Sequence, residues 1–194
     1  MNAFKLEEVG TKSEKFKTPK SCCLPYGSLE RALGKEERED LNKLFKQLND
    51  ANDIITVDKL HLQLAKEFSE LLETETANKV IEEYVHEIKE FLSSASALIA
   101  VRSSSNIEDL KKLSGAGLFD SILNVIASDE KGIADAIRNV WKSLYSKRAI
   151  QSRFKYRINQ EYAAMGILVQ EMILSDYSFI IHTSNPVIIQ ITHR

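Results

Sequence analysis

One stretch of the chain carries residues that could bind an anion. In "VRSSSNIEDLKKLSGAGLFDSILNV", residues 101–125, Arg102 follows an apolar run and precedes three serines. A guanidinium is permanently charged, and its planar fork of donors matches two phosphate oxygens. The Gly-Ala-Gly at positions 115–117 lets the backbone approach a ligand closely, and the free N–H groups of a turn can hold an anion. The pattern therefore indicates a polyphosphate site.

The same stretch also has a purely structural interpretation. An arginine at the end of a strand could pair with Glu108 or Asp109, and a serine-rich turn and a glycine hairpin need no ligand. The stretch lacks the Gly-Lys-Ser/Thr of a Walker A loop, and it lacks the spacing of a dinucleotide fingerprint. The residues alone leave both interpretations open.

Two short apolar segments must position these groups. "ALIAV" at 97–101 and "SILNVIA" at 121–127 are rich in β-branched residues, so both are predicted to be strands with a polar loop after Arg102. We expect Ser128 to cap a helix over residues 129–145. A last group of apolar runs is also predicted to form strands: 165–174, 177–183 and 186–192.

The N-terminal half is predicted to be helical. Turn residues before position 35 lead into a short helix with Ser28 as its N-cap and Gly34 as its stop. Residues 35–91 are highly charged, with apolar residues at helical intervals, and indicate three amphipathic helices. Helices followed by mixed segments make the expected fold class α+β.

Charged side chains on these helices are expected to be solvated faces. This applies to the basic helix "KRAIQSRFKYR" with Arg148 and Arg153, although both could add positive field near a phosphate. His61 and His86 are expected to lie on surfaces or in helix packing.

Composition narrows the class of protein. The 194 residues are 43% hydrophobic and 28% charged, with a net charge of −2, which gives no pull toward nucleic acid or membrane. Cys22 and Cys23 are adjacent, so a disulfide between them is geometrically improbable and a reducing compartment is indicated. With no secretory signal or membrane span, we expect a cytoplasmic protein, or a plastid one if a transit peptide is missing.

Longer motifs resemble a known family. "VRSSSNIEDL" followed by "SGAGLFDSILNV" is similar to the signature of the dikinase ATP-grasp domain, found in phosphoenolpyruvate synthases, pyruvate phosphate dikinases and water dikinases. "VWKSLYSKRAIQSR" and "AMGILVQEMILSDYSFIIHTSNPV" resemble the α-glucan water dikinases of starch metabolism most. "VGTKSEKF" and "LPYGSLERAL" resemble segments near the start of that domain.

The resemblance implies an ATP site with magnesium. Lys12 takes the place of the lysine that reaches the nucleotide phosphates, and Arg102 that of the arginine that clamps them. Gly117 and Ser121 take the places of a turn backbone and a hydroxyl at the phosphates. A hinge that contacts adenine is implied for three consecutive residues: Gln170, Glu171 and Met172.

The resemblance also implies what lies outside this sequence. We expect residues 1–194 to be part of an ATP-grasp domain, with a first lobe over 1–165 and the hinge and start of the second lobe over 166–194. The whole enzyme would transfer the β-phosphate of ATP through a phosphohistidine to an α-glucan, and the γ-phosphate to water. His182 is not expected to be that histidine, and this chain alone is expected to be inactive. Two alternatives are a fragment of a phosphoenolpyruvate synthase or pyruvate phosphate dikinase, and a degenerate interaction module.

Overall fold

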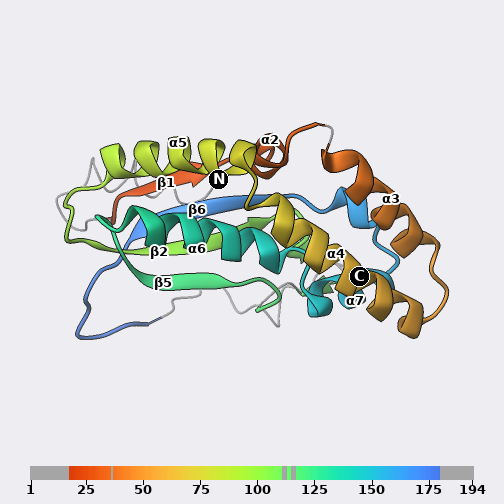
Figure 1. The fold of residues 1–194 in the computed structure, drawn as a ribbon. Helices are drawn as coiled ribbons and strands as arrows, with labels where there is room; N and C mark the ends of the chain where they lie inside the picture. The colour runs from red at the N-terminus through yellow and green to blue at the C-terminus, as the bar shows by residue number, and fades with distance from the viewer. Residues whose placement is uncertain (1–17, 36, 111–112, 115–116, 180–194) are drawn as a thin grey trace.

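A four-stranded antiparallel sheet in the order β1-β6-β2-β5 is the centre of the fold (Figure 1). The computed structural model describes residues 18–35, 37–110, 113–114 and 117–179. The strands of this sheet are β1 (Ser21–Leu24), β2 (Leu98–Ser105), β5 (Ser121–Ile126) and β6 (Met165–Glu171). A two-stranded ladder joins β3 (Asp109–Leu110) and β4 (Leu113–Ser114). The expected α+β class with an antiparallel sheet is confirmed.

The helices follow the predicted periodicity. They are α2 (Ser28–Leu33), α3 (Glu37–Asp50), α4 (Ile54–Leu71), α5 (Glu75–Phe91), α6 (Glu130–Ser143), α7 (Lys147–Lys155) and the 3₁₀ turn η1 (Gln160–Tyr162). The three amphipathic helices expected over residues 35–91 are therefore α3, α4 and α5. Helices α5 and α6 pack together along the sheet, and α3, α4 and α7 lie beyond its end (Figure 1).

Two predicted caps are wrong. Helix α2 follows Gly27, whose φ of 96° requires a residue without a Cβ, and the hydroxyl of Ser28 is buried with no hydrogen bond. Helix α6 is capped by Asp129 rather than Ser128, because the Asp129 carboxylate accepts a hydrogen bond from the N–H of Gly132 at 2.9 Å. The helix also ends at Ser143, two residues before the expected Tyr145.

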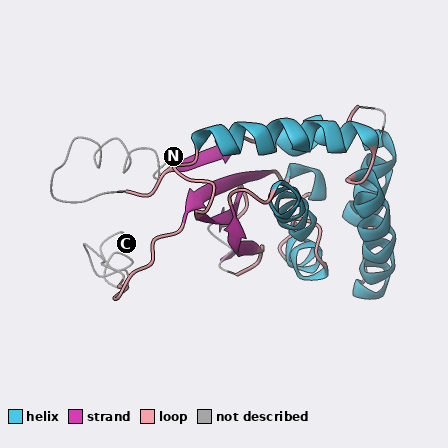
Figure 2. Cartoon of the chain, turned by 60° about the vertical axis from the view of Figure 1, so that its left-hand side comes forward, coloured by secondary structure: helices cyan, strands magenta, loops and turns pink. Residues whose placement is uncertain are grey.

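The two faces of the sheet differ in burial. On β2, Ile99 and Val101 are completely buried under the helices, whereas Arg102 and Ser104 are exposed. A half-buried strand alternates with a period of two, although Ala100, on the same face as Arg102, is also buried. Figure 2 shows the helices gathered on one side of the strands, so the face that carries Arg102 is not covered by a described helix. We call it the open face.

Strand β2 runs further than predicted. It continues through Ser105, so the serines belong to the strand and not to a polar loop. Ser105 is buried and its hydroxyl donates to the Ala164 carbonyl at 2.9 Å, which satisfies the polar group inside the sheet. The residues of β6 supply the pairing that extends β2, from Ile99↔Glu171 to Ser105↔Met165.

The C-terminal strand predictions are only partly confirmed. Strand β6 ends at Glu171, earlier than the expected residue 174, and residues 177–179 are not in a strand. The rest of the expected strand at 177–183 and all of that at 186–192 lie outside the described residues, as does His182. Because β6 lies between β1 and β2, the segment expected to begin the hinge is a central strand here. The lobe boundary itself stays a prediction.

The expected solvated face of α7 is wrong for Arg153. Its side chain is fully buried, and its Nε donates to Gln160 Oε1 at 2.6 Å. The guanidinium also stacks 5.6 Å from the centre of the Tyr145 ring. Burial lowers the pKa of Arg153 to about 10. Arg148, in contrast, is exposed as expected.

Candidate functional site

Arg102 lies at the centre of the open face, between two strands. It pairs directly with Ser121 on β5 and with Leu168 on β6. Residues directly opposite in an antiparallel pair share a face, with Cβ atoms about 4.5–5.5 Å apart. The arginine and the Ser121 hydroxyl are both exposed, so two donors that the sequence separates by 19 positions stand side by side.

The guanidinium of Arg102 has no partner within the described part of the chain. Among the residues that the structure describes, no acidic side chain forms an ion pair with it and no acceptor takes a hydrogen bond from it. The alternative partner Glu108 is itself engaged, since its carboxylate accepts a hydrogen bond from the Ser103 hydroxyl at 3.2 Å. The side chain of Asp109 is not among those described. An exposed arginine without a partner is free to bind an anion.

Gln170 lies on the same face as Arg102. It pairs with Ala100 on β2 and with Ser21 on β1, two positions along β6 from Leu168. Its place is thus diagonal to Arg102, a relation that puts side chains about 7–8 Å apart. A ligand lying along β2 and β6 can reach both side chains.

The turn before β5 is described at Gly117, while Gly115 and Ala116 lie outside the described residues. Gly117 has a φ of 71°, and an added Cβ would meet nothing within 4 Å. Its neighbour Leu118 is buried, and Arg148 Nη2 donates to the Leu118 carbonyl at 3.2 Å. This hydrogen bond holds the turn at the start of the strand that bears Ser121.

Glu171 and Met172 form hydrogen bonds within the protein. Glu171 pairs with the buried Ile99, so its side chain is on the helix-covered face, where the carboxylate accepts a hydrogen bond from the N–H of Ser93 at 2.5 Å. The Met172 N–H donates to the Leu98 carbonyl at 2.8 Å, and its Sδ accepts the N–H of Asn124 at 3.3 Å. The structure therefore brings Arg102, Ser121 and Gln170 together and turns the Glu171 carboxylate away from them. Lys12 lies outside the described residues.

No motif in the sequence points to Cys23 as a neighbour of Arg102, Ser121 and Gln170. Residues 21–24 lie among the turn residues before position 35, yet they form the edge strand β1. Cys23 pairs with Leu168, which pairs with Arg102, so the exposed thiol is on the open face two strands away from the guanidinium. Partial burial raises the pKa of this thiol, which keeps it neutral at pH 7. Only the register of β1 on β6 reveals this position.

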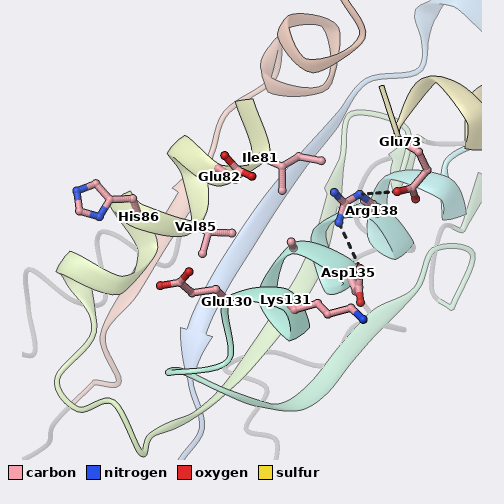
Figure 3. A pocket seen from close by; sticks show the side chains of 10 residues that line it. Glu73, Ile81, Glu82, Val85, His86, Glu130, Lys131, Asp135 and Arg138 are labelled. Carbon is pink, nitrogen blue, oxygen red and sulfur yellow. Dashed lines mark hydrogen bonds and ion pairs between the residues drawn. The ribbon is translucent and has the colours of Figure 1, made fainter. Parts of the chain in front are cut away.

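A separate groove lies on the helical side, between α5 and α6. It has a volume of about 530 Å³, and Figure 3 shows the charged residues around it. Arg138 forms ion pairs with Asp135 and Glu73 and also donates to the Leu72 carbonyl at 3.2 Å. Because these charges satisfy one another, the groove offers less to an anion than the open face does.

The described residues contain neither a cluster of metal ligands nor a membrane-spanning helix. No group of three or more His, Cys, Asp or Glu side chains among them could hold a metal ion. No described helix is both long and apolar enough to cross a membrane.

Comparison with known proteins identifies relatives over almost the whole sequence. Residues 3–192 match the family described as "Pyruvate phosphate dikinase, AMP/ATP-binding domain". A probable phosphoenolpyruvate synthase of Archaeoglobus fulgidus is 37% identical over 46% of this chain and 12% of its own length. A rifampicin phosphotransferase of Bacillus cereus is 26% identical over 89% of this chain and 19% of its own length. A chloroplastic α-glucan water dikinase of Citrus reticulata is 47% identical over 26% of this chain and 4% of its own length. The chain spans about a tenth of the length of the curated relatives it matches first.

Proposed function

Because the chain belongs to the family of pyruvate phosphate dikinase AMP/ATP-binding domains, we propose that its open face binds the phosphates of ATP as one lobe of an ATP-grasp fold. The observation that carries the proposal is the pairing of Arg102 with Ser121 on that face, with the arginine exposed and without a partner among the described residues. A planar guanidinium can bind two phosphate oxygens at once. The Arg102 guanidinium and the Ser121 hydroxyl are donors that suit the phosphates of ATP, the ligand that the family description implies.

Each residue of the site has its own role in this proposal. Arg102 holds a phosphate through its fork of donors, and the Ser121 hydroxyl donates to a neighbouring oxygen. Gly117 leaves room for phosphate beside the turn, since no atom of the described residues lies within 4 Å of the place of its Cβ. Lys12 is proposed as a further positive charge toward the phosphates. These donors stabilise charge on the phosphates, which is the main contribution of a protein to phosphoryl transfer.

The other end of the nucleotide is proposed to lie toward Gln170. This side chain is diagonal to Arg102, and the end of β6 beyond it is held by the Met172 N–H on the Leu98 carbonyl. The side chain of Glu171 binds Ser93, so any contact of Glu171 with adenine would use its backbone carbonyl. Magnesium is proposed to accompany ATP as its usual counterion in such reactions.

For the parent protein we propose an ATP-dependent dikinase that passes the β-phosphate of ATP through a phosphohistidine to an acceptor. The match to phosphoenolpyruvate synthase covers 46% of the chain, and the match to α-glucan water dikinase covers 26%. The longer matches favour the branch of phosphoenolpyruvate synthase and pyruvate phosphate dikinase over the glucan branch. An α-glucan acceptor stays the secondary proposal, and it rests on a short match of high identity.

Isothermal titration calorimetry with Mg–ATP tests the nucleotide site. We expect binding in the micromolar to millimolar range, and a weakening of at least about tenfold for Arg102→Ala, since a hydrogen bond to a charged group contributes about 1.5–3 kcal/mol. Arg31→Ala is the matched control, because it removes the same charge from α2, where Arg31 pairs with Glu83. Equal affinity in the two variants would contradict the proposed site, and an absence of binding by the parent protein would favour the degenerate module.

A further inference from the structure

A pocket distant from the open face lies where α2, α3 and η1 meet. Its volume is about 350 Å³, within the range of small-molecule sites. The floor is apolar and includes Leu29, Leu41 and Phe45, all of them buried. Polar side chains line the rest of it: Glu30, Arg38, Asn42, Tyr145 and Glu161. The pocket thus combines an apolar floor with polar groups.

The polar groups of this pocket lack partners. The Oε2 atom of Glu30 is buried without a hydrogen bond. Tyr145 lines the pocket with only 7% of its surface exposed, and no described residue donates to or accepts from its hydroxyl. A buried polar group without a partner is costly, so folded proteins rarely leave one without a ligand or water. The Glu30 oxygen is such a group, and the Tyr145 hydroxyl lines the same cavity, so the two together point to a bound molecule.

Tyr145 is fixed in position by its aromatic neighbours. Its ring stacks on Phe45 with centroids 5.1 Å apart and meets Phe68 edge-on at 4.9 Å. Arg153 lies 5.6 Å from the centre of the same ring, and its Nε donates a hydrogen bond to Gln160. The hydroxyl is therefore presented to the cavity by a rigid support, as a binding site requires.

The charges decide the class of ligand. The buried oxygen of Glu30 accepts hydrogen bonds only, and Glu161 adds a second carboxylate, against the single guanidinium of Arg38 that lines the pocket. An ammonium group would supply the donors and the positive charge that Glu30 lacks. From these contacts we propose that the pocket binds a small molecule with an apolar body and an ammonium group. Such a group is found in simple amines and in apolar amino acids, whose carboxylate could reach Arg38.

This site is independent of the nucleotide site. Its residues come from α2, α3, η1 and the segment between α6 and α7 that holds Tyr145, with Ala163 after η1, whereas the open face is formed by β1, β2, β5 and β6. Failure of ATP to bind would leave the amine proposal untouched, and the reverse also holds.

Calorimetric titration with three probes of similar size tests the proposal. Phenethylamine and L-phenylalanine carry the ammonium group, and 2-phenylethanol lacks it. We expect at least one ammonium probe to bind with a dissociation constant in about the millimolar range or below, and 2-phenylethanol to bind at least about fivefold more weakly. Tighter binding of phenylalanine would assign its carboxylate to Arg38, and tighter binding of phenethylamine would assign the pocket to simple amines.

The substitution Glu30→Gln keeps the shape of the side chain and removes its charge. We expect this substitution to weaken the binding of the ammonium probe about fivefold or more. Glu87→Gln, at an exposed position of α5, is the control and should leave binding unchanged. The proposal is overturned if no ammonium probe binds, if 2-phenylethanol binds equally well, or if Glu30→Gln has no more effect than the control. The comparison of probes on the unsubstituted chain does not depend on the folding of any variant.

Discussion

Replacing Gln160 with leucine should destabilise the protein strongly, because it isolates a buried charge. Arg153 is fully buried, and the Gln160 Oε1 atom at 2.6 Å is its one hydrogen-bond acceptor within the described part of the chain. The Nη1 and Nη2 atoms of Arg153 are buried without hydrogen bonds. Burial lowers the pKa of Arg153 from 12.5 to about 10, which corresponds to about 3 kcal/mol against its charged form.

The expected loss of stability follows from the burial of the Arg153 guanidinium. Removing one partner of a buried charged group typically costs about 3–5 kcal/mol. Gln160 also loses the bond from its Nε2 to the Ile150 carbonyl, which is long at 3.3 Å. Leucine fills a similar volume, so a cavity adds little. We expect the free energy of unfolding to fall by about 3 kcal/mol.

Urea denaturation followed by circular dichroism measures this effect in a double-mutant cycle. The variants are Gln160→Leu, Arg153→Met and the two together, with Gln47→Leu at an exposed position of α3 as the control. Arg153→Met removes the charge, so the double variant should recover about 2 kcal/mol of the loss caused by Gln160→Leu. A loss below about 1 kcal/mol for Gln160→Leu, or a double variant no more stable than that single one, would refute the reasoning.

Three further predictions concern a cap, a turn and a titration. Asp129→Ala should lower the free energy of unfolding by about 1 kcal/mol in urea denaturation, because it removes the cap on the N–H of Gly132, whereas Ser128→Ala should change it by less than about 0.5 kcal/mol. Gly117→Ala should lower that free energy by about 1 kcal/mol and weaken Mg–ATP in calorimetry, since alanine is strained at a φ of 71°; unchanged values for both would contradict a fixed turn. Burial raises the pKa of Tyr145 to about 12, so its phenol ionises in unfolded chains near pH 10 but not in folded ones, and this group favours unfolding as the pH rises from 10 to 12. Absorbance at 295 nm of the unsubstituted chain and Tyr145→Phe should be alike at pH 10.5, and a difference there would show an accessible phenol.

The helices could be predicted from sequence because their apolar residues recur at the helical period. α5, for example, buries Val80, Ile81, Tyr84, Val85 and Ile88 on one face. Strand β1 could not, because four residues between prolines carry too little pattern. Its strand character comes from pairing with β6, some 145 positions later in the chain.

The candidate site was predictable in part. The motif around Arg102 indicated phosphate chemistry, but the pairing of Arg102 with Ser121, and the diagonal place of Gln170, depend on the register between strands. The irregularity in β2–β5 pairing between Ile99 and Val101 shows how local geometry sets this register. A one-residue slip would turn each side chain of a strand to the other face, and the pattern of a single strand does not name the residues opposite it.

The burial of Arg153 shows the same limit. The sequence of α7 places Arg153 among other basic residues and so predicts a basic surface. In the structure, however, Arg153 contacts Tyr145 from the segment before α7 and Gln160 from the segment after it. The sequence of one helix does not reveal what other elements place around it.

The most direct test of the nucleotide site is a nuclear magnetic resonance titration of the isotope-labelled chain with Mg–ATP. The proposed site predicts the largest amide shift changes at Arg102, Gly117, Ser121 and Gln170, and small changes at Glu82 and Lys131 in the groove between α5 and α6. Large changes confined to that groove, with the open face unaffected, would contradict the assignment of the site to Arg102 and its neighbours.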